Sequence, residues 1–198
     1  MRIAVIQLAY DDSESVAERT ERAAGLVEQQ RGHDLVVLPE LWSAGGFDYR
    51  SWEERAQQVD GDVVQRMAQA AREIGAMVHA GSIVERPGDE TGPEGKELWN
   101  TSVVLDATGE RVATYRKIHR FGFGGGEPKL MEAGEDVVVE QAVRGQRVPA
   151  ERAVLAVQRG EAAAGLAHDR HERGHVVQLQ LGLGGDVHGA LGDEHVRP

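Results

Sequence analysis

The stretch DLVVLPE, residues 34–40, decides the fold, because it is an apolar run of strand length that stops at Pro39. A short apolar run bounded by polar or turn residues is typical of a strand that is buried on both faces. IAVIQL at residues 3–8 repeats this pattern, and MVHAGSIVER at residues 77–86 is also strand-like. We therefore expect a sheet that needs cover on both of its faces.

The segments between these strands have helical periodicity. Ser13 or Ser15 can cap a first helix, in which apolar residues recur at helical spacing up to Gly32. A second helix is predicted over residues 61–75, which carry an apolar stripe along one side. Each helix thus connects two predicted strands.

Two more strands are predicted over residues 98–106 and 111–119, as a hairpin around Ala107-Thr108-Gly109-Glu110. The resulting order is β-α-β-α-β-β-β. Alternating strands and helices that end in a meander favour an α/β domain with the helices on one face of the sheet. A second sheet would supply the cover that the other face needs.

Composition and charge exclude several classes of function. The 198 residues carry a net charge of −11 and contain no cysteine. This charge would repel nucleic acid and anionic membranes, so we expect neither as a partner. The start of the chain lacks the features of a signal peptide, and no apolar run is long enough to cross a bilayer. A cytoplasmic protein is the expectation.

The last part of the chain has an unusual alphabet. From Ala142 to Pro198 only ten residue types occur, and the ten missing types are present 33 times in the first 141 residues. The ten that remain can all be encoded by codons that begin with G or C. A folding constraint does not explain this, because a core gains as much from Ile and Phe as from Leu and Val. We expect a GC-rich gene read out of frame or on the wrong strand; a natural disordered extension is the alternative.

Glu40 is the first candidate for a functional residue. It follows Pro39 at the carboxyl end of a predicted buried strand, where the ligand crevices of α/β sheets lie. A carboxylate that is desolvated there can hold a raised pKa and act as a general base. The alternative is a helix cap or a surface charge.

Lys117 and Glu127 are the other two candidates. Lys117 lies at the end of a predicted strand, where a lysine can stabilise an oxyanion or simply be solvated. Glu127 lies ten residues further on, beyond FGFGGG, and is either a second carboxylate of the site or an exposed loop acid. The glycine run lacks the GK[ST] ending of a phosphate loop and opens no predicted helix, so a mobile loop is expected.

Several motifs together resemble the nitrilase, or carbon-nitrogen hydrolase, superfamily. The resemblance runs in order from residue 1 to about residue 140, and its motifs are VIQL, VVLPELW, GSIVER, LWNTSVVLDATGE, YRKIHRF and GEPKLMEAGED. It implies that residues 1–140 are the N-terminal part of an α-β-β-α sandwich domain, which commonly dimerises. Residues 141–198 are then expected to be a tail unrelated to that fold.

The resemblance also implies a reaction. Members hydrolyse non-peptide carbon-nitrogen bonds in small amides, nitriles or N-carbamoyl compounds, with no metal or organic cofactor. By the family's pattern Glu40 would be the general base, Lys117 the oxyanion stabiliser and Glu127 a second carboxylate that positions Lys117 or substrate. This assignment is chemically sound, because a thiol attacks only after a base has taken its proton.

The family's nucleophile is a cysteine, and this sequence has none. No serine follows Ser102, so serine cannot replace it. We therefore expect a member of the family by descent that is inactive as written.

Two alternatives remain open. His171-Glu172-Arg173-Gly174-His175 matches H-E-x-x-H, in which two histidines bind zinc and the glutamate activates water. Gly174 weakens a helix there, and five of the eight histidines fall within residues 168–195, where such a match arises easily by chance. The other alternative is a non-catalytic remnant that forms a homodimer.

Overall fold

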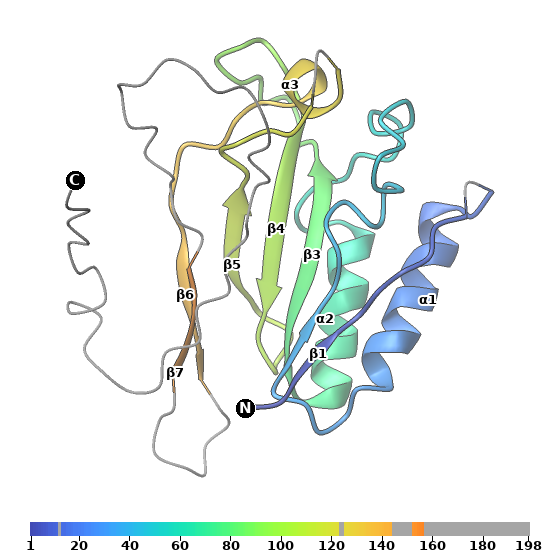
Figure 1. Ribbon diagram of the computed structural model, residues 1–198, viewed down its shortest axis with the longest axis vertical. Helices are drawn as coiled ribbons and strands as arrows, with labels where there is room; N and C mark the ends of the chain where they lie inside the picture. The colour runs from blue at the N-terminus through green and yellow to red at the C-terminus, as the bar shows by residue number, and fades with distance from the viewer. Residues whose placement is uncertain (12, 123–124, 144–151, 157–198) are drawn as a thin grey trace, which may run out of the picture.

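The computed structural model describes residues 1–11, 13–122, 125–143 and 152–156. Its main feature is a five-stranded sheet with helices packed against one face (Figure 1). In spatial order the strands are β1 (Ile3–Val5), β2 (Leu35–Val37), β3 (Met77–Glu85), β4 (Trp99–Leu105) and β5 (Arg111–Arg116). The first three are parallel, and β4 and β5 continue the sheet as an antiparallel meander. The predicted order of these elements is confirmed.

Both long helices lie on the same side of this sheet (Figure 1). Helix α1 (Val16–Glu28) begins at Ser15, whose hydroxyl accepts from the Glu18 N–H while the Glu18 carboxylate accepts from the Ser15 N–H. This capping box selects Ser15 over Ser13 as the cap. Helix α2 (Asp62–Ile74) ends at Gly75, whose left-handed φ of 64° terminates the helix.

A hydrophobic core fills the space between the helices and the sheet. The residues that form it are apolar side chains of both helices and of alternate strand positions, among them Val27, Val36, Met67, Val78 and Val103. Burying each large side chain contributes roughly 1.5–3 kcal/mol to folding. The apolar stripe predicted for residues 61–75 is the face of α2 that packs here.

The first two strands are shorter than their apolar runs. Strand β2 ends at Val37 because Pro39 lacks the N–H that a continued ladder needs. Beyond β1 the Ile6 N–H still donates to the Val37 carbonyl, at 2.9 Å, so the chain follows the sheet edge without forming a longer ladder. The observed strands therefore end earlier than the strands predicted over residues 3–8 and 34–40.

The other face of the sheet is unevenly covered. Cross-strand partners Val5, Val37, His79 and Val104 form a row there, in which Val5 is 77% exposed and Val104 only 3% exposed. Strands β6 (Val139–Val143) and β7 (Arg152–Ala156) pair as a separate antiparallel sheet near β5 (Figure 1). This is the only other sheet among the described residues, and β7 falls within the segment expected to be an unrelated tail.

Within the described ranges, none of the helices has the length and apolar character needed to cross a bilayer.

Candidate functional site

The chain topology brings the three candidate residues to one end of the sheet. Strand β5 runs in the same direction as β2, because each antiparallel pairing from β3 to β5 reverses the direction. Glu40, which follows β2, and Lys117, which follows β5 directly, therefore leave the sheet at the same edge. The short helix α3 (Glu127–Leu130) lies over this edge and supplies Glu127 (Figure 1).

The three side chains are in direct contact. Lys117 Nζ lies 2.7 Å from Glu40 Oε1, 2.9 Å from Glu127 Oε2 and 3.1 Å from Glu127 Oε1. One ammonium thus bridges two carboxylates that lie far apart in the sequence. We call Glu40, Lys117 and Glu127 the charged cluster.

A bulge in β3 shapes the turn that carries Glu40. The ladder between β3 and β4 shifts between His79 and Ser82, and Gly81 in between has a φ of 67°. A Cβ atom on Gly81 would lie 1.9 Å from the Pro39 carbonyl oxygen. Only glycine therefore lets β3 approach the chain immediately before Glu40.

Hydrogen bonds from the same bulge hold the residues after Glu40. Leu41 adopts a left-handed φ of 49°, and its N–H donates to Ser82 Oγ at 3.0 Å. The indole N–H of the fully buried Trp42 donates to the Ala80 carbonyl at 2.8 Å. A non-glycine residue in this conformation marks a strained turn at the site.

Arg19 of α1 holds the next residues of this turn, around Ser43, by hydrogen bonds to carbonyl oxygens. Its guanidinium is 1% exposed and donates to the carbonyl oxygens of Ser43 at 3.1 Å and Asp11 at 2.8 Å. It also pairs with Glu14 at 3.1 Å. A buried arginine that satisfies carbonyl oxygens holds a loop in place without secondary structure.

Backbone contacts position Lys117. Its N–H donates to the Asn100 carbonyl at 2.8 Å, and its own carbonyl accepts from the Gly134 N–H at 2.9 Å. A Cβ on Gly134 would lie 2.0 Å from the Arg116 carbonyl oxygen, so glycine is required for this close approach. The lysine is thus clamped between β4 and the chain that follows α3.

Glu127 is buried, with a side chain 4% exposed. The Phe121 N–H donates to its Oε2, so both carboxylate oxygens have partners. The expectation that the glycine run opens no helix is wrong, because Gly126 is the residue immediately before α3. A four-residue helix carries too little periodicity to be predicted from sequence.

Glu40 is the exposed carboxylate of the charged cluster. Its side chain is 57% exposed among the described residues, so of the two environments that its sequence position left open, a desolvated carboxylate or a surface charge, the exposed one is present. The exposure arises because Glu40 lies in the turn beyond the end of β2 and not within the buried strand. Burial is instead a property of Glu127 and Lys117, whose side chains are 4% and 16% exposed.

The electrostatics of Lys117 result from two opposing effects. Burial acts to lower the pKa of its ammonium, while the hydrogen bonds and charges of Glu40 and Glu127 act to raise it. The carboxylates prevail, and the pKa of Lys117 lies above its ordinary value of 10.5. The lysine is therefore a fixed cation at neutral pH.

Asn100 completes the contacts, although no sequence motif singled it out. It is 3% exposed, lies near the start of β4, and its amide nitrogen donates to Glu40 Oε1 at 2.7 Å and to Glu127 Oε1 at 2.5 Å. The signal available in the sequence was that this residue is the chain's sole asparagine and falls inside a predicted strand.

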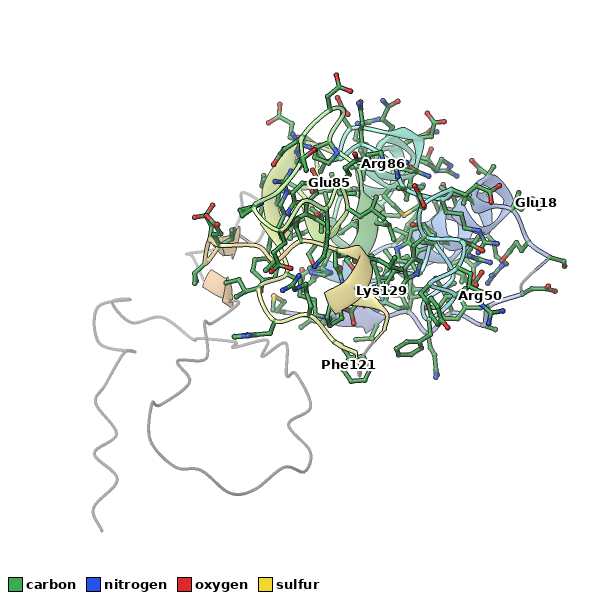
Figure 2. The ribbon with its side chains drawn as sticks, turned by 90° about the horizontal axis from the view of Figure 1, so that it is seen from above. Glu18, Arg50, Glu85, Arg86, Phe121 and Lys129 are labelled. Atoms are coloured by element: carbon green, nitrogen blue, oxygen red, sulfur yellow. The ribbon has the colours of Figure 1, made fainter. Side chains whose placement is uncertain are left out.

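Two aromatic residues flank the cluster. Phe47, in the loop after Glu40, and Phe121, in the loop after Lys117, make an edge-on ring contact with centroids 6.3 Å apart. In Figure 2, Phe121 projects outward beyond Lys129 of α3. The charged cluster thus has an apolar neighbour on the outer surface.

The alternative of a zinc site at the H-E-x-x-H motif lies outside the part of the chain that the structure describes. His171, Glu172 and His175 lie outside the described residues. Within the part of the chain that the structure describes, no group of three or more His, Asp or Glu residues is arranged to hold a metal ion.

The chain has clear similarity to known proteins. A family model described as carbon-nitrogen hydrolase matches residues 2–182, further than the boundary expected near residue 140. A 2-oxoglutaramate amidase from Paenarthrobacter nicotinovorans is 42% identical over 134 residues, which are 68% of this chain and 45% of that protein. Omega-amidase NIT2 from Bos taurus is 30% identical over 122 residues, or 61% of this chain and 41% of that protein. The chain thus spans less than half the length of these curated relatives.

Solved structures show the same fold. A CN-hydrolase superfamily protein from Xanthomonas campestris has a TM-score of 0.61 at 24% identity, over 78% of this chain and 51% of its own. Nit3 from Saccharomyces cerevisiae, a nitrilase superfamily member, has a TM-score of 0.57 at 24% identity, over 72% of this chain and 52% of its own. The sheet and its helices therefore have the architecture of that superfamily.

Proposed function

Because the chain belongs to the carbon-nitrogen hydrolase family, we propose that the charged cluster is the site at which a small non-peptide amide is bound for hydrolysis. The observation that carries this proposal is the single ammonium of Lys117 in contact with the carboxylates of both Glu40 and Glu127. This arrangement places a proton acceptor beside a fixed cation, and acyl transfer requires both.

The surroundings of the two carboxylates support different roles. Glu40 is exposed, and among the described residues its Oε2 atom has no hydrogen bond, so this oxygen is free to accept a proton. Glu127 is buried and both of its oxygens have donors. We therefore assign the general base to Glu40 and the positioning of Lys117 to Glu127.

Lys117 would stabilise the negative oxygen that develops as a nucleophile attacks the amide carbon. Its ammonium is fixed by two carboxylates and a clamped backbone, so no reorganisation is required when charge develops. Its raised pKa keeps the ammonium charged throughout the neutral range.

The relatives narrow the substrate class. The two curated relatives described above are named as a 2-oxoglutaramate amidase and an omega-amidase. We propose a small carboxamide as the ligand, ahead of nitriles and N-carbamoyl compounds.

We further propose that this chain does not turn over its ligand. The 198 residues contain no cysteine, so the thiolate that the family uses as nucleophile is not supplied by them. Removing the nucleophile from a comparable catalytic set costs on the order of a millionfold in kcat. The cluster would then bind an amide and leave it intact.

Ammonia release tests the absence of turnover. The purified chain is assayed with 2-oxoglutaramate, simple amides, nitriles and N-carbamoyl compounds, with and without a zinc chelator, beside Glu40→Gln as background. We expect no release above that background. Release that ignores the chelator and disappears in Glu40→Gln would refute the proposal, whereas chelator-sensitive hydrolysis would favour the zinc alternative of His171, Glu172 and His175.

Binding is tested separately through the lysines. The chain has only Lys96, Lys117 and Lys129, so ¹³C-lysine labelling gives three side-chain signals that Lys→Arg variants assign. Added 2-oxoglutaramate or another small carboxamide should move the Lys117 signal and leave the Lys129 signal in place. Unchanged Lys117 signals across the amide panel would contradict the proposed site.

The alternative of a non-catalytic homodimer rests on a different surface. Val5 is 77% exposed on the sheet face opposite the helices, so this face is available for an apolar contact. Light scattering of the purified chain decides this alternative, because a uniform dimer supports it and a monomer excludes it.

A further inference from the structure

The side chain of Asn100 donates to the same two carboxylate oxygens as the side chain of Lys117. Its Nδ2 donates to Glu40 Oε1 at 2.7 Å and to Glu127 Oε1 at 2.5 Å. Lys117 Nζ lies 2.7 Å and 3.1 Å from the same two oxygens. Two nitrogens that donate and two oxygens that accept therefore alternate around a closed ring.

An amide is chemically suited to this place. The side-chain nitrogen of asparagine has two N–H groups and no charge, so it can bridge two carboxylates without competing with Lys117 as a cation. An apolar residue here would remove one of the two donors that each of these oxygens has, and would leave Lys117 to hold both carboxylates alone. An acidic residue would add a third negative charge to the cluster.

The backbone of Asn100 fixes this bridge in space. The residue is 3% exposed and pairs with Val84 in the ladder between β3 and β4. Its carbonyl accepts the Lys117 N–H at 2.8 Å. Asn100 therefore holds the lysine by its main chain and both of the lysine's carboxylate partners by its side chain.

We propose that Asn100 is a positioning residue, which sets the separation of the Glu40 and Glu127 carboxylates so that one ammonium contacts both. This inference rests on the proposed function for the chemistry that the cluster serves. The contacts that define it are independent of whether an amide is hydrolysed.

The consequence of losing the bridge follows from the charges. Two carboxylates that close together repel each other, and Glu40, with a side chain 57% exposed, is free to turn toward water. Lys117 would remain buried but keep only Glu127 as a close partner. Its ammonium would then be less stabilised, and its pKa would fall.

The first test uses the fact that Asn100 is the only asparagine in the chain. Labelling with ¹⁵N-asparagine gives one side-chain NH₂ pair and no overlap. We expect both protons to be shifted downfield and to exchange slowly with water. Glu40→Gln should move one of the two proton signals most, and Glu127→Gln should move the other.

The second test measures Lys117 in variants of β4. In Asn100→Ala, the pKa of Lys117, followed by its ¹³Cε signal, should fall by on the order of one pH unit. Ser102→Ala is the matched control, because Ser102 lies two residues along the same strand and therefore on the same face. In that variant the pKa of Lys117 should equal that of the unmodified chain.

Each outcome decides the inference. It is overturned if the asparagine side-chain protons exchange as in a free amide, or if Asn100→Ala leaves the pKa of Lys117 unchanged. Should Asn100→Ala fail to fold, the labelled unmodified chain and the two glutamine variants still decide it. A failure of amide binding would count against the proposed function alone, since none of these signals depends on a ligand.

Discussion

Glu40 and Glu127 carry the same charge toward the same lysine, yet their surroundings differ. The Glu40 side chain is 57% exposed and the Glu127 side chain is 4% exposed. Exposed ion pairs contribute little to stability, whereas a buried charge that loses its partner is costly. The two residues should therefore respond differently to the same neutral substitution.

Urea denaturation of two glutamine variants measures this difference. Glu127→Gln should lower the free energy of unfolding by about 2–3 kcal/mol, because an amide placed beside the Lys117 ammonium leaves buried groups unpaired. Glu40→Gln should lower it by less than about 1 kcal/mol. Equal losses in the two variants would show that Glu127 is not held as the structure indicates.

His79 predicts how stability changes with pH. Burial lowers the pKa of its imidazole below the ordinary value of 6.5, despite the opposing effect of a backbone hydrogen bond. The unfolded chain then binds a proton at a higher pH than the folded chain does. The stability that His79 contributes is complete above pH 6.5 and is lost as the pH falls from there through the lower, folded-state pKa.

Unfolding measured between pH 7 and pH 5 checks this expectation. His79→Gln should lose less stability over this interval than the unmodified chain does, because the substituted side chain takes up no proton. Parallel curves for the unmodified chain and His79→Gln would contradict a buried, neutral His79.

The bulge in β3 predicts that glycine is required at position 81. In Gly81→Ala the new Cβ would lie 1.9 Å from the Pro39 carbonyl oxygen, at a φ of 67°. We expect a loss of more than about 3 kcal/mol, because a clash with backbone cannot be relieved by a side-chain movement.

Gly75→Ala is the matched control for that substitution. Gly75 has a similar φ of 64° but has no atom within 4 Å of the added Cβ. It should lose only about 1–2 kcal/mol, which is the cost of the left-handed conformation alone. Similar losses in the two variants would mean that the contact between β3 and the Glu40 turn does not exist.

The elements also show which features of this protein can be predicted from sequence. Strand and helix order follows from apolar periodicity, and a serine cap at Ser13 or Ser15 follows from its position before a helical pattern. The choice of Ser15 is made only by the capping box seen in the structure. The bulge at Gly81 and the helix α3 could not be predicted, because both depend on contacts with distant segments.

The sequence allowed the charged residues of the candidate site to be predicted, but not how those residues are arranged in space. The sequence indicated Glu40, Lys117 and Glu127 through motifs at family-like intervals, and the structure brings their side chains together. The exposure of Glu40 and the bridge by Asn100 depend on where strands end in space. A one-dimensional pattern does not contain that information.

In the molecule as a whole, the uncovered part of the sheet face opposite the helices and the missing thiol relate to the same part of the chain. The described residues leave Val5 exposed opposite the helices, and residues 142–198 contain none of the ten residue types that include Cys, Ile, Phe and Trp. The family match continues to residue 182, although the 42%-identical amidase aligns over only 134 residues. We propose that a misread frame begins near residue 141, because the restricted set of residue types begins there.

The coding DNA tests this proposal directly. A G/C-biased third codon position, shifted to the first position, restricts a translated segment to these ten residue types, whatever the fold requires. We expect one shifted frame beyond codon 141 to continue with the full residue alphabet, including a cysteine some tens of codons after Lys117 and the apolar segments of a second sheet. Homologous loci should carry that frame intact. If codons there begin often with A or T and no shifted frame continues the upstream pattern, the tail is native to this protein, and the absence of the thiol is a property of this chain itself.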